Sequence, residues 1–198
     1  MNIAILGGSF DPPHRGHAII AKRLLKLNKF DEVWLIPLFS HPFNKSLSSP
    51  QKRLEMTKLL ENGKIRVSDF EIKKRRTSYT IATLKTLGKN SPRDRFSLII
   101  GTDQVKDFTK WKNWKEIINN FKLIIVPRAG FKKAEKELKD IAKQIDFPKN
   151  IILINKKEFP PIYISSTFAR QKIRQRKSAI TMLPKKIEEY IIRNKLYR

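Results

Sequence analysis

The stretch NIAILGGSFDPPHRGH, residues 2–17, determines how the first part of the chain folds. Asn2–Leu6 is a short apolar run typical of a strand that is covered on both faces. Residues 7–17 then hold three glycines, two prolines and two histidines, a composition that ends a strand and forms a turn. His14 and His17 are three positions apart, so both lie on one face where a helix begins. We therefore expect a loop at the end of a strand that presents two imidazoles.

Strand-like and helix-like segments alternate along the rest of the chain. The expected strands are short, β-branched and apolar: Asn2–Leu6, Glu32–Pro37, Ile65–Phe70, Phe96–Ile100, Leu123–Val126 and Ile151–Ile154. The expected helices show helical spacing of apolar residues: Ala18–Leu27, Gln51–Leu60, Thr80–Leu87 (stopped by Gly88), Lys112–Asn120 and Lys132–Gln144. This alternation predicts one α/β domain over residues 1–198, a doubly wound, Rossmann-like parallel sheet with helices on both faces. Ligands bind such sheets at the carboxyl ends of the strands, where Gly7–His17 lies.

The last third of the chain predicts a C-terminal helical extension. Ser165-Ser166-Thr167 can cap a helix that runs through Ile173. Pro184 suits the first turn of a final helix, which has Ile187, Tyr190 and Ile191 on one face. Ser40–Pro50 has the composition of an exposed loop that carries ligand contacts.

The charge of the chain points to partners that carry phosphate. There are 43 Lys and Arg residues against 18 Asp and Glu, which gives a net charge of +25. The basic residues are spread along the whole chain and accompany no known nucleic-acid-binding motif, so a compositional bias explains much of the excess. An enzyme for nucleotides and a basic nucleic-acid-binding protein both stay open at this point. We expect neither a signal peptide nor a membrane span, and the 0 cysteines fit a reducing cytoplasm.

The loop at Gly7–His17 has the chemistry of a phosphate cradle. The dinucleotide fingerprint G-x-G-x-x-G is absent. Backbone amides at a helix start carry partial positive charge, and the two imidazoles add hydrogen-bond donors. Gly16 removes a side chain between the histidines, where a ligand approaches closely. The loop is therefore predicted to bind a phosphate chain.

Motifs in the same order along the chain resemble those of one enzyme family. GGSFDPPHRGH resembles the H-x-G-H signature of the nucleotidyltransferase superfamily, in the version carried by bacterial nicotinate mononucleotide adenylyltransferases. The chain also carries segments similar to that family's basic loop, S-Y-T, G-x-D with a following tryptophan, I-S-S-T-x-x-R and ending: Asn44-Lys45, Ser78-Tyr79-Thr80, Gly101-Thr102-Asp103 with Trp111, Ile164-Ser165-Ser166-Thr167 with Arg170, and Leu196-Tyr197. Ala82 stands where that family usually has an acidic residue, and Lys112 stands where it commonly has an aromatic one.

The resemblance implies a nucleotidyltransferase fold and a role for each matched residue. It implies catalytic roles for His14, His17, Lys45 and Arg170. It implies ATP contacts from Gly7, Gly8, Ser9, Phe10, His14, His17, Gly101, Asp103, Ile164, Ser166, Thr167 and Arg170. It implies mononucleotide contacts from Ser9, Phe10, Lys45, Tyr79, Thr80 and Trp111. From the residues alone, Asp103 and Ser166-Thr167 can also be plain helix caps, and Trp114 is expected in the core.

The reaction implied is adenylyl transfer from ATP to nicotinate mononucleotide, which gives deamido-NAD and pyrophosphate in NAD biosynthesis. Mg²⁺ is expected on the ATP phosphates, with no metal ligand from the protein, and a homo-oligomer is compatible with the sequence. Alternatives within the superfamily are nicotinamide mononucleotide or phosphopantetheine as the acceptor, or a cytidylyltransferase. An alternative of another class is a basic nucleic-acid-binding protein that reuses the fold.

Overall fold

The computed structural model describes residues 1–41, 46–128, 150–154 and 159–198. These residues form two compact units: the first comprises Met1–Leu6 and Tyr79–Tyr163, and the second comprises Gly7–Ser78 and Ile164–Arg198. The single domain over residues 1–198 stays a prediction. Within the described ranges, no helix is both long enough and apolar enough to cross a membrane.

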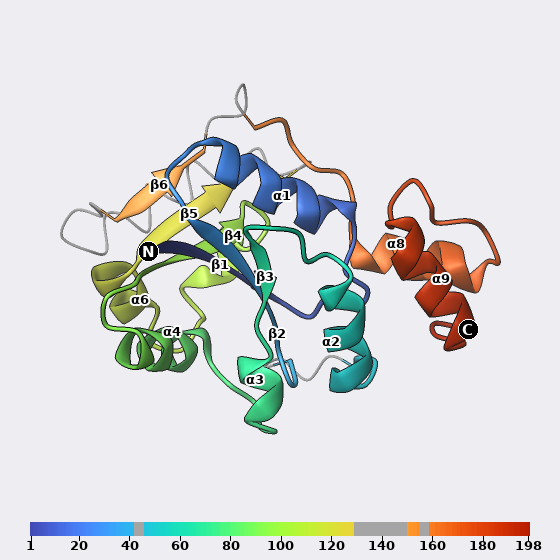
Figure 1. Ribbon diagram of the computed structural model, residues 1–198, viewed down its shortest axis with the longest axis horizontal. Coiled ribbons are helices and arrows are strands. Elements are labelled where there is room, and N and C mark those ends of the chain that lie inside the picture. Colours follow the sequence, from blue (N-terminus) through green and yellow to red (C-terminus); the bar gives the residue numbers. More distant parts are fainter. Residues whose placement is uncertain (42–45, 129–149, 155–158) are drawn as a thin grey trace. The chain divides into compact units, whose positions relative to one another are not determined.

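A six-stranded sheet with the order β3-β2-β1-β4-β5-β6 is the framework of the chain (Figure 1). The strands are β1 (Asn2–Gly8), β2 (Glu32–Pro37), β3 (Ile65–Val67), β4 (Arg95–Gly101), β5 (Lys122–Val126) and β6 (Ile151–Leu153). The pairs β1–β4, β4–β5, β5–β6 and β2–β3 are all parallel. The strand order runs outward from β1 in both directions, which confirms the predicted doubly wound architecture and puts the switch point beside β1.

Among the described residues of the first unit, the strands are accompanied by the helices α4 (Thr80–Asn90), α5 (Val105–Phe108) and α6 (Trp114–Asn120). α4 packs on β4, α6 packs on β5, and the two helices lie against each other (Figure 1). β4 is buried from Phe96 to Gly101, as expected for a strand covered on both faces. The prediction that Gly88 stops α4 is wrong. Gly88 does not adopt a left-handed backbone, so the helix continues to Asn90, where the N–H of Ser91 bonds to the carbonyl of Leu87.

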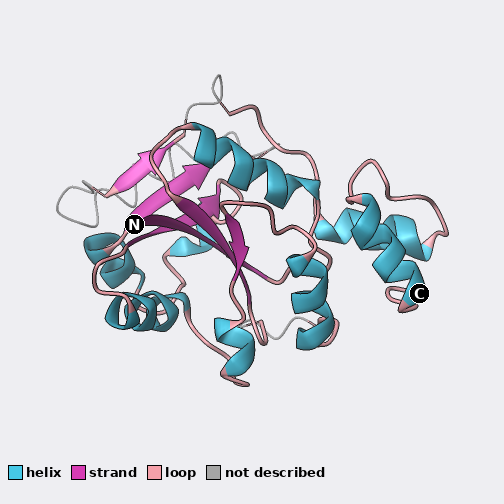
Figure 2. Cartoon of the chain, in the orientation of Figure 1, coloured by secondary structure: helices cyan, strands magenta, loops and turns pink. Residues whose placement is uncertain are grey.

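The second unit holds β2, β3 and the remaining described helices. These helices are α1 (Arg15–Lys26), α2 (Pro50–Lys58), α3 (Phe70–Lys73), α8 (Ser166–Arg174) and α9 (Lys185–Arg193). Figure 2 colours all described helices cyan and the strands magenta. The prediction of a strand over Ile65–Phe70 is wrong beyond Val67. The N–H of Phe70 bonds to the hydroxyl of Ser68 at 3.3 Å, and this local bond turns the chain into α3. The helix predicted at Lys132–Gln144 lies outside the described residues.

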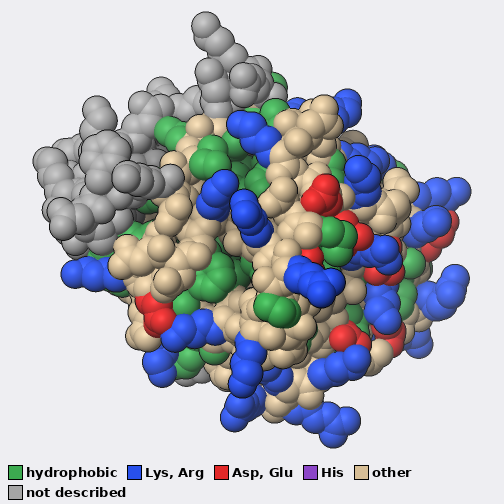
Figure 3. Space-filling model, turned by 60° about the vertical axis from the view of Figure 1, so that its left-hand side comes forward, with side chains coloured by type: hydrophobic (Ala, Val, Ile, Leu, Met, Phe, Trp, Pro, Cys, Tyr) green, Lys and Arg blue, Asp and Glu red, His purple; other side chains and the backbone are tan. Residues whose placement is uncertain are grey.

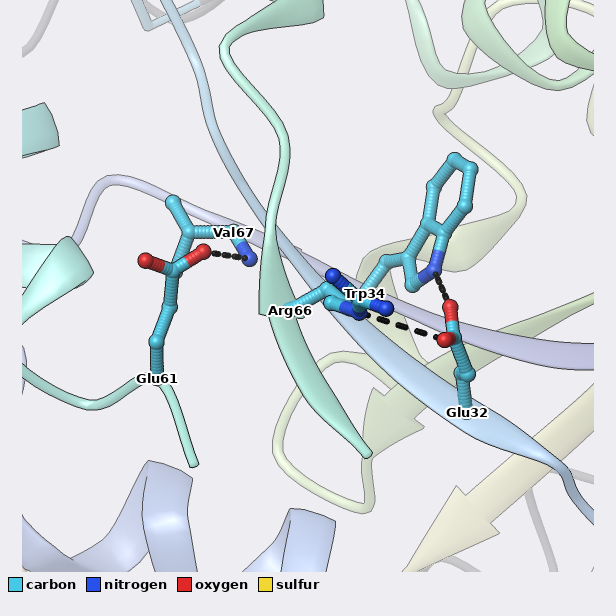
Figure 4. A network of polar contacts seen from close by, with 5 residues as sticks. All are labelled: Glu32, Trp34, Glu61, Arg66 and Val67. Carbon is cyan, nitrogen blue, oxygen red and sulfur yellow. Dashed lines mark hydrogen bonds and ion pairs between the residues drawn. The ribbon is translucent and has the colours of Figure 1, made fainter. Parts of the chain in front are cut away.

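Two glutamate side chains form hydrogen bonds with the outer strand β3 and with its neighbour β2 (Figure 4). The carboxylate of Glu61 accepts the N–H of Val67 at 3.0 Å, which satisfies a backbone donor on this edge strand. The carboxylate of Glu32 accepts the indole N–H of Trp34 at 2.7 Å and the Nε–H of Arg66 at 3.2 Å. The Arg66 side chain is 62% exposed, so this ion pair contributes little to stability.

The predicted helical extension is present, and it is fastened to the start of α1. Ser165 caps α8, and α9 follows Pro184 with Ile187 and Ile191 buried. The N–H of Arg15 donates to the carbonyl of Met182 at 2.8 Å. The Arg15 guanidinium donates to the carbonyls of Ile180 and Leu183 at 3.2 Å each. The extension therefore supports the end of α1 at which the two histidines lie.

Candidate active site

The loop after β1 lies at the carboxyl end of that strand, as predicted. Gly8 is the last residue of β1, and its carbonyl accepts the N–H of Leu38 at 3.1 Å. A Cβ atom placed on Gly7 would meet no heavy atom of the described residues within 4 Å. The backbone here is thus open to the close approach of a ligand.

The two histidines lie against each other at the first turn of α1, which confirms their predicted shared face. Their rings are stacked with centroids 3.8 Å apart. The backbone N–H of His14 donates to Nδ1 of His17 at 3.1 Å, so in the neutral ring of His17 the proton is on Nε2. His14 is 3% exposed, whereas His17 is partly exposed. His17 therefore carries a fixed N–H donor beside the amides of a helix N-terminus.

Phe10 packs its ring against the ring of His17. Its ring centroid is 4.7 Å from that of His17, and its side chain is 2% exposed. Its φ angle of 49° is in the left-handed region, which is strained for a residue with a large side chain. Burial of the ring offsets this strain, so the turn holds the imidazole in one place.

Helix α8 joins the same loop, although it lies about 150 residues later in the sequence. Ser166 Oγ donates to the carbonyl of Pro12 at 2.8 Å, and Arg170 Nη1 donates to the carbonyl of Asp11 at 2.6 Å. Within the predicted cap Ser165-Ser166-Thr167, the capping residue of α8 is Ser165, whose hydroxyl accepts the N–H of Phe168; the alternative that Ser166 and Thr167 are plain caps does not hold. Thr167 Oγ1 is exposed and accepts from Arg170 at 3.4 Å. Two helix N-termini, those of α1 and α8, thus meet at one loop.

Arg53 on α2 organises this region, and it was not singled out from the sequence. Its side chain is 0% exposed, and it donates to four backbone carbonyls, those of Ser9, Leu38, Phe39 and Ser48, at 2.6–2.9 Å. Burial lowers the pKa of Arg53 from its usual value, and the charge of Asp11 opposes that shift. In the sequence, Arg53 shares a helical face with Met56, Thr57 and Leu60, which are buried. An arginine on the face of a helix that packs into the core was the feature that could have indicated its role.

In the first unit, Gly101 and Asp103 are packed together at the end of β4. A Cβ atom on Gly101 would overlap Asp103 Oδ1 and lie 2.8 Å from Arg128 Cγ, so a larger residue here would force these side chains to shift. The Asp103 carboxylate is 3.9 Å from Nε of Arg128, a partner that sequence reasoning missed. The residue that precedes α5 is Gln104, so Asp103 is not the cap of this helix. Its carboxylate is one-third exposed and can accept further hydrogen bonds.

Tyr79 of the S-Y-T segment and the tryptophan segment also meet within the first unit. Lys112 Nζ lies 4.7 Å from the centroid of the Tyr79 ring, and Tyr79 is 42% exposed at the start of α4, directly before Thr80. Trp111 is partly exposed, and its ring centroid is 5.4 Å from that of the fully buried Phe108. The ring centroid of Trp114 is 6.1 Å from that of Phe108, in an edge-on arrangement, and Trp114 is also partly exposed. The prediction that Trp114 is a core residue is therefore wrong, because Phe108 fills that place.

The structure thus divides the predicted site residues between the two units. The second unit contains the predicted phosphate-binding residues: Gly7, Gly8, Ser9, Phe10, His14, His17, Ile164, Ser166, Thr167 and Arg170. The first unit contains the predicted ribose and pyridine contacts: Gly101, Asp103, Tyr79, Thr80 and Trp111. Lys45 lies outside the described residues.

Comparison with known proteins assigns the chain first to a class and then to a family. The cytidylyltransferase-like family model matches residues 5–172, which defines a nucleotidyltransferase. A probable nicotinate-nucleotide adenylyltransferase of Caldicellulosiruptor bescii is 37% identical over 207 residues, and one of Flavobacterium johnsoniae is 34% identical over 202 residues; both alignments cover 100% of each chain. The solved structure of Plasmodium falciparum nicotinic acid mononucleotide adenylyltransferase complexed with NaAD matches with a TM-score of 0.83 at 27% identity, covering 99% of this chain and 97% of that one. The chain belongs to the nicotinate-nucleotide adenylyltransferase family.

The buried guanidinium of Arg53 is expected to be necessary for stability. Arg53→Met leaves four carbonyls without their donor, and we expect the free energy of unfolding to fall by about 3–5 kcal/mol. Urea unfolding followed by circular dichroism measures this change. The neighbouring Lys52→Met is the control, since its side chain holds none of these carbonyls, and its effect is expected within about 0.5 kcal/mol. Equal unfolding midpoints for the two variants would contradict the role of Arg53.

Proposed function

We propose that this chain transfers the adenylyl group of ATP to nicotinate mononucleotide and so produces deamido-NAD and pyrophosphate. The observation that carries the proposal is the stacked pair His14 and His17 at the start of α1, joined to the start of α8 through Ser166 and Arg170. Family membership and the NaAD complex of a structural relative support the choice of substrate. The absence of cysteine and the metabolite substrates favour the cytoplasm.

The chemistry needs charge neutralisation and positioning, and it needs no nucleophile or base from the protein. A phosphate oxygen of the mononucleotide attacks the α-phosphorus of ATP, and the bond from that phosphorus to the bridging oxygen of the β-phosphate breaks. Pyrophosphate leaves with the electron pair, and no proton has to move. Negative charge grows on the oxygens around the α-phosphorus and on the leaving pyrophosphate, so donors fixed in advance accelerate the reaction.

The second unit offers such donors. We assign Nε2 of His17 to the α-phosphate and His14 to the adjacent phosphates. We assign the backbone of Gly7, which is open, and the backbone of Gly8, Ser9 and Phe10 to contacts with both substrates. Ser166, Thr167 and Arg170 at the start of α8 bind the β- and γ-phosphates, together with backbone contacts from Ile164. Lys45 adds a point charge for a phosphate.

Mg²⁺ is part of the Mg–ATP substrate in this proposal. The carboxylate of Asp11 is occupied by the Tyr197 hydroxyl at 2.6 Å and the N–H of Ser48 at 3.2 Å. The phosphates and water therefore hold the ion, and the basic residues of the loop bind the phosphates.

The first unit supplies the remaining contacts. We assign Gly101 and Asp103 to the adenosine ribose, because a partly exposed carboxylate accepts hydroxyl hydrogens. Tyr79, Thr80 and Trp111 are assigned to the pyridine ring. We propose that Lys112 favours nicotinate mononucleotide over nicotinamide mononucleotide. Its ammonium lies over the Tyr79 ring. The acids nearest to it in the sequence pair with other lysines, Asp107 with Lys110 and Glu116 with Lys85. A positive charge beside this pocket attracts a carboxylate and gains nothing from a neutral amide.

Nucleic acid is a weaker candidate partner. On the face shown in Figure 3, Lys and Arg side chains are scattered, with no single dense patch. Because Lys and Arg are also spread along the whole sequence, we propose that the charge of +25 reflects composition and not a specific nucleic-acid site.

The decisive assay incubates the protein with Mg–ATP and one acceptor at a time. The acceptors are nicotinate mononucleotide, nicotinamide mononucleotide and phosphopantetheine, and both pyrophosphate and the adenylylated product are measured. We expect the highest kcat/KM with nicotinate mononucleotide. If only phosphopantetheine were adenylylated, the chain would be a phosphopantetheine adenylyltransferase, and the proposed function would be wrong.

His17 is expected to act on kcat. His17→Ala removes the donor to the α-phosphate and should lower kcat by about 10²–10³-fold, as loss of one oxyanion donor does. His17→Gln restores an N–H near the position of Nε2 and should recover part of this loss. Steady-state kinetics with both variants measures the effect, and thermal unfolding checks that the fold persists. Near-normal turnover of a folded His17→Ala variant would remove this residue from the mechanism.

Trp111 is expected to act on mononucleotide binding. Stacking of a base on an aromatic ring contributes about 1–3 kcal/mol, so Trp111→Ala should raise the mononucleotide KM by about ten- to a hundred-fold and leave the ATP KM nearly constant. Trp114→Ala is a matched control, because both indoles pack on Phe108. The two variants should lose similar thermal stability, and only Trp111→Ala should change KM. A change of KM in the Trp114 variant alone would contradict the assignment.

Lys112 is expected to set the preference between the two mononucleotides. Lys112→Met should lower kcat/KM for nicotinate mononucleotide by about five-fold, an effect of about 1 kcal/mol for a solvated charge pair. The value for nicotinamide mononucleotide should stay unchanged. Lys115→Met is the control. Lys115 Nζ lies 5.7 Å from the ring centroid of Trp114, and Trp114 has no assigned contact with the substrate. Equal changes with both substrates would exclude a role in selection.

A further inference from the structure

The carboxylate of Asp11 is buried within the loop that carries the two histidines, yet the proposed reaction does not use it. Asp11 is 3% exposed. Its Oδ1 accepts the hydroxyl of Tyr197 at 2.6 Å, and its Oδ2 accepts the N–H of Ser48 at 3.2 Å. Its backbone carbonyl accepts Arg170 Nη1 at 2.6 Å. Four segments of the second unit therefore meet at this single residue.

The buried guanidinium of Arg53 opposes the negative charge of Asp11. The guanidinium of Arg53 bonds to the carbonyls of Ser9 and Ser48, so a buried cation holds two of the segments that contact Asp11. A buried carboxylate is costly unless it is paired and hydrogen-bonded, and both of its oxygens here have a donor. Removal of one donor leaves part of that cost unopposed and loosens the loop.

The chain after α9 is shaped so that Tyr197 reaches Asp11. Lys195 and Tyr197 have φ angles of 52° and 62°, a left-handed backbone that is strained in residues other than glycine. The N–H of Leu196 turns back to the carbonyl of Ile191 at 3.1 Å. The hydrogen bond to Asp11 is a tertiary contact that offsets this strain. Burial and the bond to Asp11 raise the pKa of the Tyr197 hydroxyl, so it remains a donor at neutral pH.

We propose that Tyr197 is a positioning residue for adenylyl transfer, which holds the Asp11 carboxylate and thereby fixes the loop Ser9–His17 before ATP binds. This inference rests on the proposed function of that loop. Asp11 lies three residues before His14, so freedom at Asp11 is transmitted to both imidazoles through a short chain segment. A loop that is already ordered needs no ordering on binding, and its donors are in place for the transition state.

The first experiment removes one oxygen atom. Tyr197→Phe keeps the ring and deletes the donor to Asp11, and we expect kcat to fall by about ten- to a hundred-fold, the range for a hydrogen bond to a charged group. Tyr190→Phe is the matched control, because this tyrosine on α9 donates to the carboxylate of Glu55 at 2.5 Å and does not touch the loop. Tyr190→Phe should leave kcat unchanged. An equal loss in the two variants, or no loss in Tyr197→Phe, would overturn the proposal.

A double-mutant cycle then tests whether Tyr197 acts through Asp11. In an Asp11→Asn background the carboxylate is gone, so the additional change Tyr197→Phe should lower kcat far less than it does in the wild-type chain. Full additivity of the two effects would show that Tyr197 acts by another route.

Hydrogen exchange separates this inference from the proposed function. Amides of residues 9–17 should exchange faster in Tyr197→Phe than in the wild-type chain, and those of β4 should not change. This measurement needs no substrate, so it tests the loop even if the wild-type chain transfers no adenylyl group. Unchanged exchange at residues 9–17 would overturn the positioning role, whereas absent transfer in the wild-type chain would overturn the proposed function.

Discussion

Buried backbone carbonyls just after β1 and β2 need hydrogen-bond donors, and the buried guanidinium of Arg53 provides them. Strand ends leave C=O groups without ladder partners, and each one buried without a donor costs free energy. Arg53 bonds to the carbonyls of Ser9, Leu38, Phe39 and Ser48. One planar group with five N–H donors can do this where a lysine ammonium cannot. The shape of the loop that carries His14 and His17 depends on this arrangement.

At the helix N-termini of the candidate phosphate-binding region, capping of the helix leaves other hydrogen-bonding groups available. At α8 the hydroxyl of Ser165 caps the helix, which leaves Ser166 to bind the carbonyl of Pro12 and leaves Thr167 exposed. At α1 the imidazole of His17 accepts the N–H of His14, so a side chain that caps the helix also presents a donor. Anions favour such sites because amides and side-chain donors point the same way.

The described acids near the predicted site residues already have partners. Asp11 is held by Tyr197 and Ser48, Asp103 lies beside Arg128, and Glu116 binds Lys85. These partners and the excess of basic residues reduce the repulsion that a polyphosphate would meet from the chain's own carboxylates. This suits a reaction in which the attacking group is already anionic and the protein has only to position it and stabilise charge.

The sequence by itself determined the order of the six strands, the doubly wound sheet and the shared face of His14 and His17, because these depend on local periodicity and on residues three apart; it missed the four-residue helices α3 and α5, which are too short to show a period. It did not determine the end of α4, since Gly88 permits a helical backbone as readily as a break. Only the tertiary structure decided which residues the loop would bind. Tyr197 reaches Asp11 across 186 positions and Ser166 reaches Pro12 across 154, and no local pattern encodes such contacts. They form because packing of the helical extension against the start of α1 brings these segments together, so Tyr197 and Ser166 acquire their partners only in the folded chain.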